Sequence, residues 1–204
     1  MSQINTLSEG AHRILDIATP LFAAKGFNGV SINDIAAAVG GSKANVFHHF
    51  PSKEALYLAV IRSACSKFRE ELQGRTDEVS GRGCKLRFIA RQHLQQMLSS
   101  PDSIRLILRE VFVGESGIKR SLVAEILHQN FGLIVDQVKQ EQDDGRIASD
   151  LNPAMIALNI IALNMFFFQS WTILEQFEEF RHLGGAQRAA DAAFDTIAKG
   201  LLIK

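Results

Sequence analysis

An all-α fold is the fold class that this 204-residue sequence predicts, and three features support it. Apolar residues recur at the three- and four-residue steps of an α-helix over most of the chain. No segment of any length alternates between apolar and polar residues, as a half-buried strand would. Proline is rare, with 4 residues, while Ala, Leu and Ile are plentiful. With 47% hydrophobic and 22% charged residues, the chain can also bury a proper core.

The first two helices have clear start and stop signals. Apolar residues at helical steps predict a first helix, namely Ile14, Leu15, Ala18, Leu21 and Phe22. Gly26 follows them as a natural helix end. Ser31, with Asp34 at the third helical position, is arranged like a capping box and predicts a second helix over 32–38.

The remaining helices bring the expected total to about nine. Ser42 is placed to cap a short helix over 43–49. A long amphipathic helix follows Pro51 and Ser52, and a polar loop is expected over 74–83. Ser100 and Pro101 suit the cap and the first position of a later helix. The last five helices are expected over 85–98, 101–112, 118–142, 153–177 and 186–202.

The segment 31–50 is the most informative one for function. Two short helices joined by a tight glycine turn cross steeply, so a small residue is needed where they touch. Ala36 is that residue, and Gly40 supplies the turn, where a positive φ is cheap only for glycine. Val46 is expected to point back from the second helix into the first. This spacing is the one expected of a helix-turn-helix, although such pairs also occur in helical proteins that never bind DNA.

Acidic residues are absent from Ile35 to Lys53, a stretch that holds two lysines and two histidines. The whole chain has 22 Lys+Arg and 22 Asp+Glu, so any nucleic-acid contact must come from a local patch. Repulsion from one carboxylate could offset a lysine–phosphate contact. On this helix Asn45 can read adenine, and Lys43 can reach guanine or a phosphate. The segment therefore favours DNA binding.

Residues 7–64 resemble the N-terminal domain of the TetR family of transcriptional regulators. The matching positions are Lys25-Gly26-Phe27, Ile35-Ala36, Gly40, Ser42-Lys43 and the run from Phe47 to Leu56. Many positions agree in order and without gaps, so the signal is specific. The C-terminal part matches the family only in its helix content.

The resemblance implies two domains and a set of DNA contacts. Residues 7–64, with a helix-turn-helix at 31–50, would bind DNA, and residues 65–204 would bind an effector and form a dimer. Carried over by position, the residues nearest the bases would be Ser42, Lys43, Ala44 and Asn45. Phe47 and His48 would lie against the sugar-phosphate backbone of the DNA, and Ser31 and Lys53 would each bind a phosphate.

Two positions depart from the family's pattern. Phe47 stands where members usually have Tyr, which removes a hydroxyl that could bond a phosphate. Gly41 stands where members usually have a larger apolar residue, so a looser turn is expected.

The resemblance also implies a regulator, usually a repressor, that leaves a palindromic operator when a small, largely apolar effector binds. Candidate pocket residues are Phe166, Phe167, Trp171 and Asn164; ordinary core or a dimer interface is the alternative for these side chains. Asn159 and Asn164 lie on an otherwise apolar helix. Because a buried unpaired amide costs roughly 1–3 kcal/mol, each needs a partner, and pairing across a dimer is the first expectation.

A homodimer is expected through the last two helices, 153–177 and 186–202. They carry more apolar surface than a small domain can bury by itself, and packing two such pairs would make a four-helix interface. Alanines would let the helices approach closely, at Ala189, Ala190, Ala192 and Ala193.

No metal, cofactor or enzymatic activity is expected. Cys65 and Cys84 lack metal-ligand spacing, and His48 and His49 are neighbours that point in different directions on a helix. No paired catalytic motif occurs. Two alternatives stay open: a helical small-molecule-binding protein or enzyme without DNA binding, and an effector-independent architectural DNA-binding protein.

A cytoplasmic protein without a membrane-spanning helix is expected. The N-terminal residues lack a basic segment followed by an apolar one, which an export signal needs. The longest apolar run, 154–168, falls short of the ~20 residues that a spanning helix requires, so a buried helix is predicted there.

Overall fold

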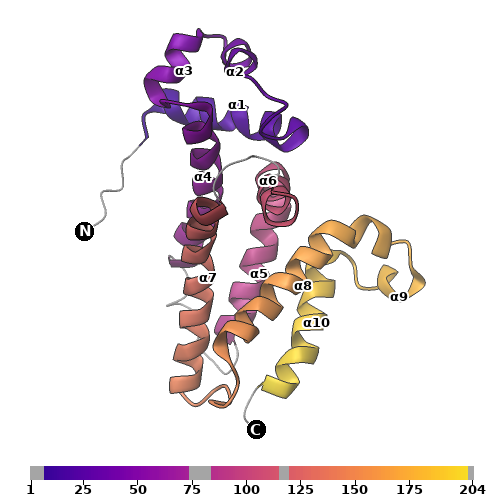
Figure 1. Ribbon diagram of the computed structural model, residues 1–204. Coiled ribbons are helices and arrows are strands. Elements are labelled where there is room, and N and C mark those ends of the chain that lie inside the picture. The colour runs from indigo at the N-terminus through magenta and orange to yellow at the C-terminus, as the bar shows by residue number, and fades with distance from the viewer. Residues whose placement is uncertain (1–6, 74–83, 115–119, 202–204) are drawn as a thin grey trace. The chain divides into compact units, whose positions relative to one another are not determined.

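The computed structural model describes residues 7–73, 84–114 and 120–201, which form ten α-helices and no β-strand (Figure 1). The predicted fold class is confirmed. The predicted loop over 74–83 lies outside the described residues. The helices are α1 (Glu9–Lys25), α2 (Ile32–Val39), α3 (Lys43–His49), α4 (Lys53–Gln73), α5 (Cys84–Ser99), α6 (Pro101–Phe112), α7 (Arg120–Asp143), α8 (Pro153–Leu174), α9 (Glu178–Arg181) and α10 (Ala186–Leu201).

The chain divides into two compact units, each of which is made of two separate segments of the sequence. The first unit comprises Met1–Cys65 together with Ser100–Ile126, and the second comprises Ser66–Ser99 with Leu127–Lys204. Helix α6 belongs to the first unit because it packs against α1. The first unit therefore holds more of the chain than residues 7–64.

An aromatic cluster joins α1, α4 and α6 in the first unit. The Tyr57 ring meets Phe22 edge-on at 5.0 Å and Phe27 at 5.1 Å between ring centroids. Its hydroxyl donates a 2.6 Å hydrogen bond to Oε1 of Glu110 on α6, and both residues are buried. A buried carboxylate needs such a partner, so this bond explains how α6 accommodates Glu110 at its packed face.

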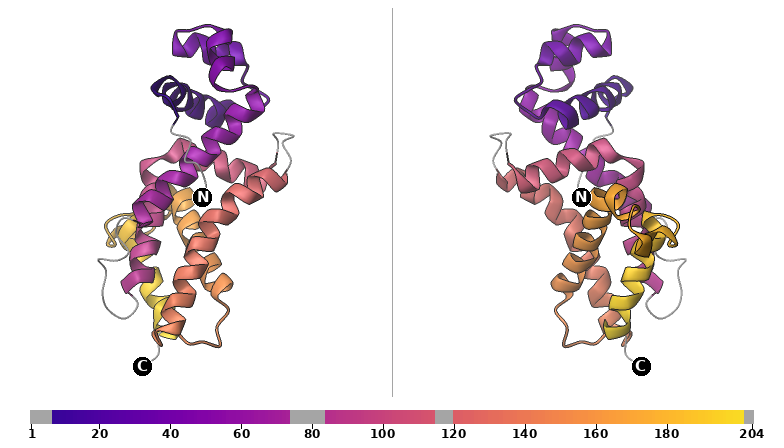
Figure 2. Two further views of the ribbon diagram at one scale, coloured as in Figure 1. Left: turned by 90° about the vertical axis from the view of Figure 1, so that its left-hand side faces the viewer. Right: turned by 90° about the vertical axis from the view of Figure 1, so that its right-hand side faces the viewer.

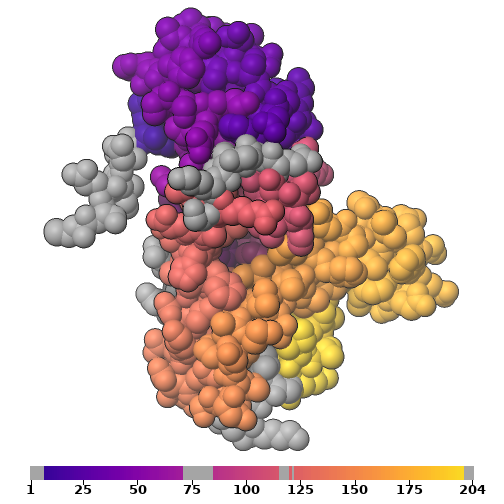
Figure 3. Space-filling model, viewed as in Figure 1, coloured from indigo at the N-terminus to yellow at the C-terminus, as the bar shows by residue number. Residues whose placement is uncertain are grey.

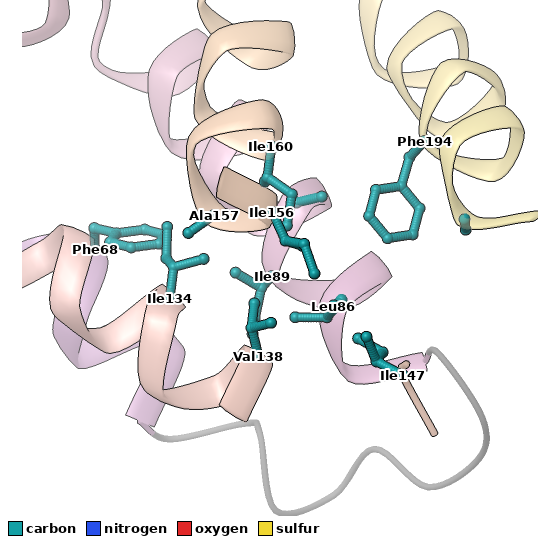
Figure 4. Packing of buried hydrophobic residues seen from close by; sticks show 12 residues of the cluster. Phe68, Leu86, Ile89, Ile134, Val138, Ile147, Ile156, Ala157, Ile160 and Phe194 are labelled. Carbon is teal, nitrogen blue, oxygen red and sulfur yellow. The ribbon is translucent and has the colours of Figure 1, made fainter. Parts of the chain in front are cut away.

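The core of the second unit lies between α5, α7, α8 and α10, of which α5, α8 and α10 contact one another; Figure 2 shows these helices from two sides. Branched aliphatic side chains from these helices interdigitate around Ile89, Val138 and Ile156, with Phe68 and Phe194 at the margins (Figure 4). A second apolar cluster comprises Leu94, Phe167, Leu174, Ala189 and Ala190.

Helix α8 is apolar on all sides and is more exposed than the sequence predicts. By length and composition it is the one described helix that could cross a membrane, and only 28% of its 18-residue apolar window is buried. The large exposed side chains on it are Met155, Leu158, Phe166 and Ile173. Figure 3 shows α8 (orange) at the surface of the molecule. The expectation of a buried helix is therefore wrong for the single chain.

Some predicted boundaries and caps also differ from the structure. Helix α8 ends at Leu174 and not at 177, because the N–H groups of Gln176 and Phe177 bond three residues back, and the four-residue α9 follows. This short helix makes ten helices where about nine were predicted. Ser100 does precede α6, but its side chain makes no capping hydrogen bond, since its backbone (φ −132°, ψ 59°) lies outside the usual cap conformation.

Candidate nucleic-acid interface

The start of α2 is closed by the predicted capping box. The Ser31 hydroxyl accepts a hydrogen bond from the Asp34 backbone N–H at 3.1 Å, and the Ser31 N–H donates to Asp34 Oδ2 at 2.8 Å. The Ser31 hydroxyl also donates to the same carboxylate at 2.7 Å. These two donors from Ser31, the backbone one first, lower the pKa of Asp34 below its ordinary value.

The turn between α2 and α3 has the predicted geometry. Gly40 is left-handed, with φ 74° and ψ 33°, and its N–H bonds the carbonyls of Ala36 and Ala37. Val46 and Ile35 are fully buried and Ala36 is 4% exposed, so the two helices touch where a small residue was expected. Helix α3 is thereby held through its inner residue, Val46, while residues 43–45, 47 and 48 are exposed.

The outer face of α3 carries the predicted base-contacting residues together. Its N-cap, Ser42, accepts a hydrogen bond from the Asn45 N–H at 3.2 Å. The Lys43 ammonium lies 5.6 Å from the centre of the Phe47 ring, which is 38% exposed. The six predicted contact residues on this face are all exposed, namely Ser42, Lys43, Ala44, Asn45, Phe47 and His48.

Lys53 is only half exposed, because it also fastens the chain before α2. Its Nζ donates a 2.9 Å hydrogen bond to the Val30 carbonyl and lies 4.2 Å from the centre of the Phe27 ring. An open cleft of about 420 Å³ is lined by Lys53, Lys43, Phe47 and the segment from Asn28 to Asp34. The predicted phosphate ligands Lys53 and Ser31 thus border one cleft with α3.

Ser31 is exposed, but its donors are already in use. Both its N–H and its hydroxyl point at the Asp34 carboxylate. A phosphate at Ser31 would have to take the hydroxyl proton from that carboxylate. Lys53 has more donor capacity to offer an anion than Ser31 has, since an ammonium has three N–H donors and the hydrogen bond to Val30 uses one.

Two contacts that hold the helix-turn-helix were not predicted from the sequence. Arg13 on α1 donates from Nη2 to the Val39 carbonyl at 3.0 Å, which satisfies the C-terminal end of α2. His49, at the end of α3, lies 3.3 Å from the Ser8 hydroxyl through its Nδ1 and packs over Gly10. The partners are 26 and 41 residues apart, so local sequence patterns could not reveal them.

The four candidate pocket residues of the second unit do not share one environment. Phe166 is 56% exposed, whereas Phe167 is buried and Trp171 packs against the same cluster as Phe167. Asn164 is 2% exposed and donates from Nδ2 to the Ala90 carbonyl at 2.7 Å, with His93 Nδ1 at 3.1 Å. Its partners lie within the fold, so the first expectation, pairing across a dimer, is wrong for Asn164. Asn159 is exposed.

His93 is an unpredicted member of this polar pair. Burial lowers its pKa from 6.5 to about 4, because the charged imidazolium loses solvation there. Its Nδ1 therefore accepts the hydrogen bond from the Asn164 amide, and the proton is on Nε2 at neutral pH.

Comparisons with known proteins agree with this geometry. Residues 14–60 match the sequence profile of the bacterial regulatory proteins of the tetR family. The HTH-type transcriptional regulator RutR of Escherichia coli is 30% identical over 129 residues, covering 62% of this chain and 60% of RutR. The match thus spans less than two thirds of that relative's length.

Solved structures share the fold over most of the chain. AibR in complex with isovaleryl coenzyme A and operator DNA has a TM-score of 0.64 at 21% identity, covering 79% of this chain and 86% of AibR. FadR from Bacillus subtilis in complex with stearoyl-CoA has a TM-score of 0.74 at 15% identity, covering 92% and 96%. The profile match and the helix-turn-helix geometry identify residues 14–60 as a DNA-binding segment of the TetR-family type, and the solved structures show that the fold of the chain is shared.

Proposed function

We propose that this protein is a transcriptional regulator that binds a palindromic operator as a homodimer and represses until a small effector releases it. One observation carries the proposal: the exposed face of α3 is free of carboxylates and is held outward by the turn at Gly40. Two similar proteins support the proposal. RutR is named as a transcriptional regulator, and AibR was solved in complex with operator DNA. The proposal also includes that the protein is located in the cytoplasm and that it has no enzymatic role.

In this proposal α3 enters the major groove and divides its contacts by chemistry. Asn45 and Lys43 read base edges together with Ser42 and Ala44. Phe47 and His48 lie against the sugar-phosphate backbone, and the Lys53 ammonium binds a phosphate in the cleft beside them. Ser31 contributes to that phosphate only when its hydroxyl leaves Asp34.

The homodimer in the proposal forms through α8 and α10. Exposed apolar side chains on these helices in the single chain include Phe166, Ile173 and Ile197. Several large apolar side chains exposed on two neighbouring helices are typical of an interface. Two copies related by a two-fold axis would cover it and place the two α3 helices for a palindromic site.

The effector in the proposal is a largely apolar small molecule bound in the second unit, which makes up most of the predicted effector domain, residues 65–204. Phe167 and Trp171 supply apolar surface, and the Asn164–His93 pair supplies the polar group that orients the ligand. Phe166, being exposed, fits the interface better than the pocket. Acyl-coenzyme A thioesters are the first class to test, because AibR and FadR were solved with such ligands.

Selection of duplexes from the source genome and from a randomised pool tests the DNA-binding function. We expect a two-fold symmetric motif, bound at least about 10³-fold more tightly than mixed-sequence DNA at the same salt concentration. Tight binding without selectivity would instead identify an architectural DNA-binding protein. No binding to any duplex would favour a helical small-molecule-binding protein or enzyme.

Release of the selected operator tests the effector. Acyl-coenzyme A of increasing chain length is added to the protein–operator complex, with free coenzyme A as the control. We expect the operator to dissociate as the acyl chain lengthens, since ligand and DNA would favour different states of the dimer. Dissociation by free coenzyme A alone would contradict an apolar effector.

A further inference from the structure

Gly41, directly before the cap of α3, is a glycine that the backbone does not require. Its neighbour Gly40 is left-handed, with φ 74°, whereas Gly41 is not among the described residues with positive φ. The Gly41 N–H donates to the Ala36 carbonyl at 2.9 Å, a bond that any residue except proline could make. The reason for a glycine here must therefore lie in the space above it.

The Asn45 side chain occupies that space. A Cβ added to Gly41 would lie 3.3 Å from Nδ2 of Asn45 and 3.9 Å from its Cβ. The first distance is shorter than ordinary van der Waals contact, so the amide would have to move by a few tenths of an ångström or change rotamer. The Asn45 amide thus lies folded back over a bare Cα, in the N-terminal direction that helical side chains favour.

We propose that Gly41 is a specificity-determining residue for operator recognition, although it has no side chain to touch DNA. By leaving the space above its Cα to the Asn45 side chain, it sets the position from which the Asn45 amide reads a base. The inference rests on the proposed DNA-binding function. Reading adenine needs both amide atoms in register with the base edge, and hydrogen bonds weaken steeply when their geometry shifts.

Gly41→Ala tests the inference in the full-length chain, with selection from a randomised duplex pool as the readout. We expect the base preference to change at one position in each half-site by at least about five-fold, with the remaining positions unchanged. If glycine served only the fold, alanine would leave the preference as it is. An unchanged selection profile would overturn the inference.

A second variant shows whether the effect passes through Asn45. In the Asn45→Ala background, Gly41→Ala is expected to change the selected sequence no further, because no amide is left to reposition. An equal shift in both backgrounds would overturn the inference, since alanine would then act on the DNA directly. Gly132→Ala is the matched control, because a Cβ there meets nothing within 4 Å and α7 lies outside the helix-turn-helix.

Thermal unfolding separates a change in reading from a loss of fold. The Gly41→Ala variant is expected to melt at or above the wild-type temperature, because alanine lowers the conformational entropy of the unfolded chain. A marked drop in melting temperature would show that the turn itself needs glycine and would overturn the inference. A wild-type protein that selects no sequence would instead contradict the proposed function.

Discussion

The outer faces of α3 and α8 are both exposed in the single chain, but their chemistry is opposite. The α3 face carries Lys43, Asn45 and His48 without a carboxylate, whereas the α8 face carries Phe166 and Ile173, at 56% and 62% exposure. The first surface suits a hydrated polyanion, and the second is costly in water and suits another apolar surface. Exposure alone does not identify a functional surface; the kind of atom exposed indicates the kind of partner.

The two helices also differ in what holds them. Local contacts define where α3 begins, because the Ser42 cap lies three residues from Asn45 and the Gly40 turn adjoins the helix; the contact of His49 with Ser8 adds to them at its end. Long-range contacts fasten α8, such as the bond from Asn164 to the Ala90 carbonyl 74 residues away. Changes to α8 are therefore expected to act through assembly and packing, and changes to α3 through DNA affinity.

The largest expected effect comes from a charge on the apolar face of α8. Phe166→Glu places a carboxylate in the proposed interface, where burial without a partner is strongly unfavourable. We expect the dimer dissociation constant to rise at least about 100-fold, since central aromatic residues dominate interfaces, and operator affinity to fall with it. Sedimentation and operator titration measure the two effects.

Thr172→Glu is the control for that charge, because it adds the same group at an exposed position of α8 away from the line through Met155, Phe166 and Ile173. If Phe166→Glu stayed dimeric with unchanged DNA binding, the α8 face would not be the dimer interface.

Acid should weaken the second unit before the first, through His93. The pKa of His93 is about 4 in the folded chain, whereas the ordinary pKa of a histidine is 6.5, so the folded chain binds fewer protons than the unfolded chain between these pH values. Stability therefore falls as the pH drops from 6.5 towards 4, by up to about 3 kcal/mol, an upper bound because His93 is only partly buried.

His93→Gln isolates this contribution, since its amide oxygen can still accept from Asn164 and does not titrate. Denaturant unfolding across the pH range measures the difference. A wild-type slope that persists in the variant would show that another group causes it.

The two lysines that line the open cleft beside α3, Lys43 and Lys53, should respond differently to substitution. Lys43→Ala and Lys53→Ala are each expected to lower operator affinity about ten-fold and to reduce the salt slope by about one. Only Lys53→Ala should also lower the melting temperature, because it removes the hydrogen bond to Val30 and the contact with Phe27. Lys139→Ala on α7 is the control, and equal affinities for all three variants would contradict the interface.

The smallest effect is expected from the capping box of α2. The Asp34 carboxylate has a lowered pKa, so its contribution to stability is present above the ordinary value of 3.8 and is lost as the pH falls through the lowered value. Asp34→Asn should remove that acid dependence, with a small drop in melting temperature at neutral pH.

The same substitution should raise operator affinity by roughly two- to five-fold, since it removes a carboxylate beside the cleft and frees Ser31. Unfolding at several pH values and an operator titration check both parts. Weaker binding by Asp34→Asn would show that the capping box serves recognition itself.

The helix-turn-helix could be predicted almost residue by residue. Ser31, Gly40 and Ser42 act on groups within a few positions of themselves, so their roles follow from residue type and spacing. Helix α3 begins and ends at the predicted residues. The partners of Arg13 and Lys53 lie 26 and 23 residues away, and no local pattern contains that information.

The second unit was predictable only in outline. Helix α8 is apolar on every side, so its sequence could not show which side chains face the core. The candidate pocket residues were chosen for their type, and packing separated the exposed Phe166 from the buried Phe167.

Residue order alone was enough for the helical class and the caps of α2 and α3, because hydrogen bonds between residues three or four apart govern both. The family resemblance also needed only the order of the matching residues. Packing between distant segments decided that α6 joins the N-terminal helices and that Asn164 bonds within the fold. Such contacts depend on how whole helices approach one another, and many sequences with the same local pattern would pack differently.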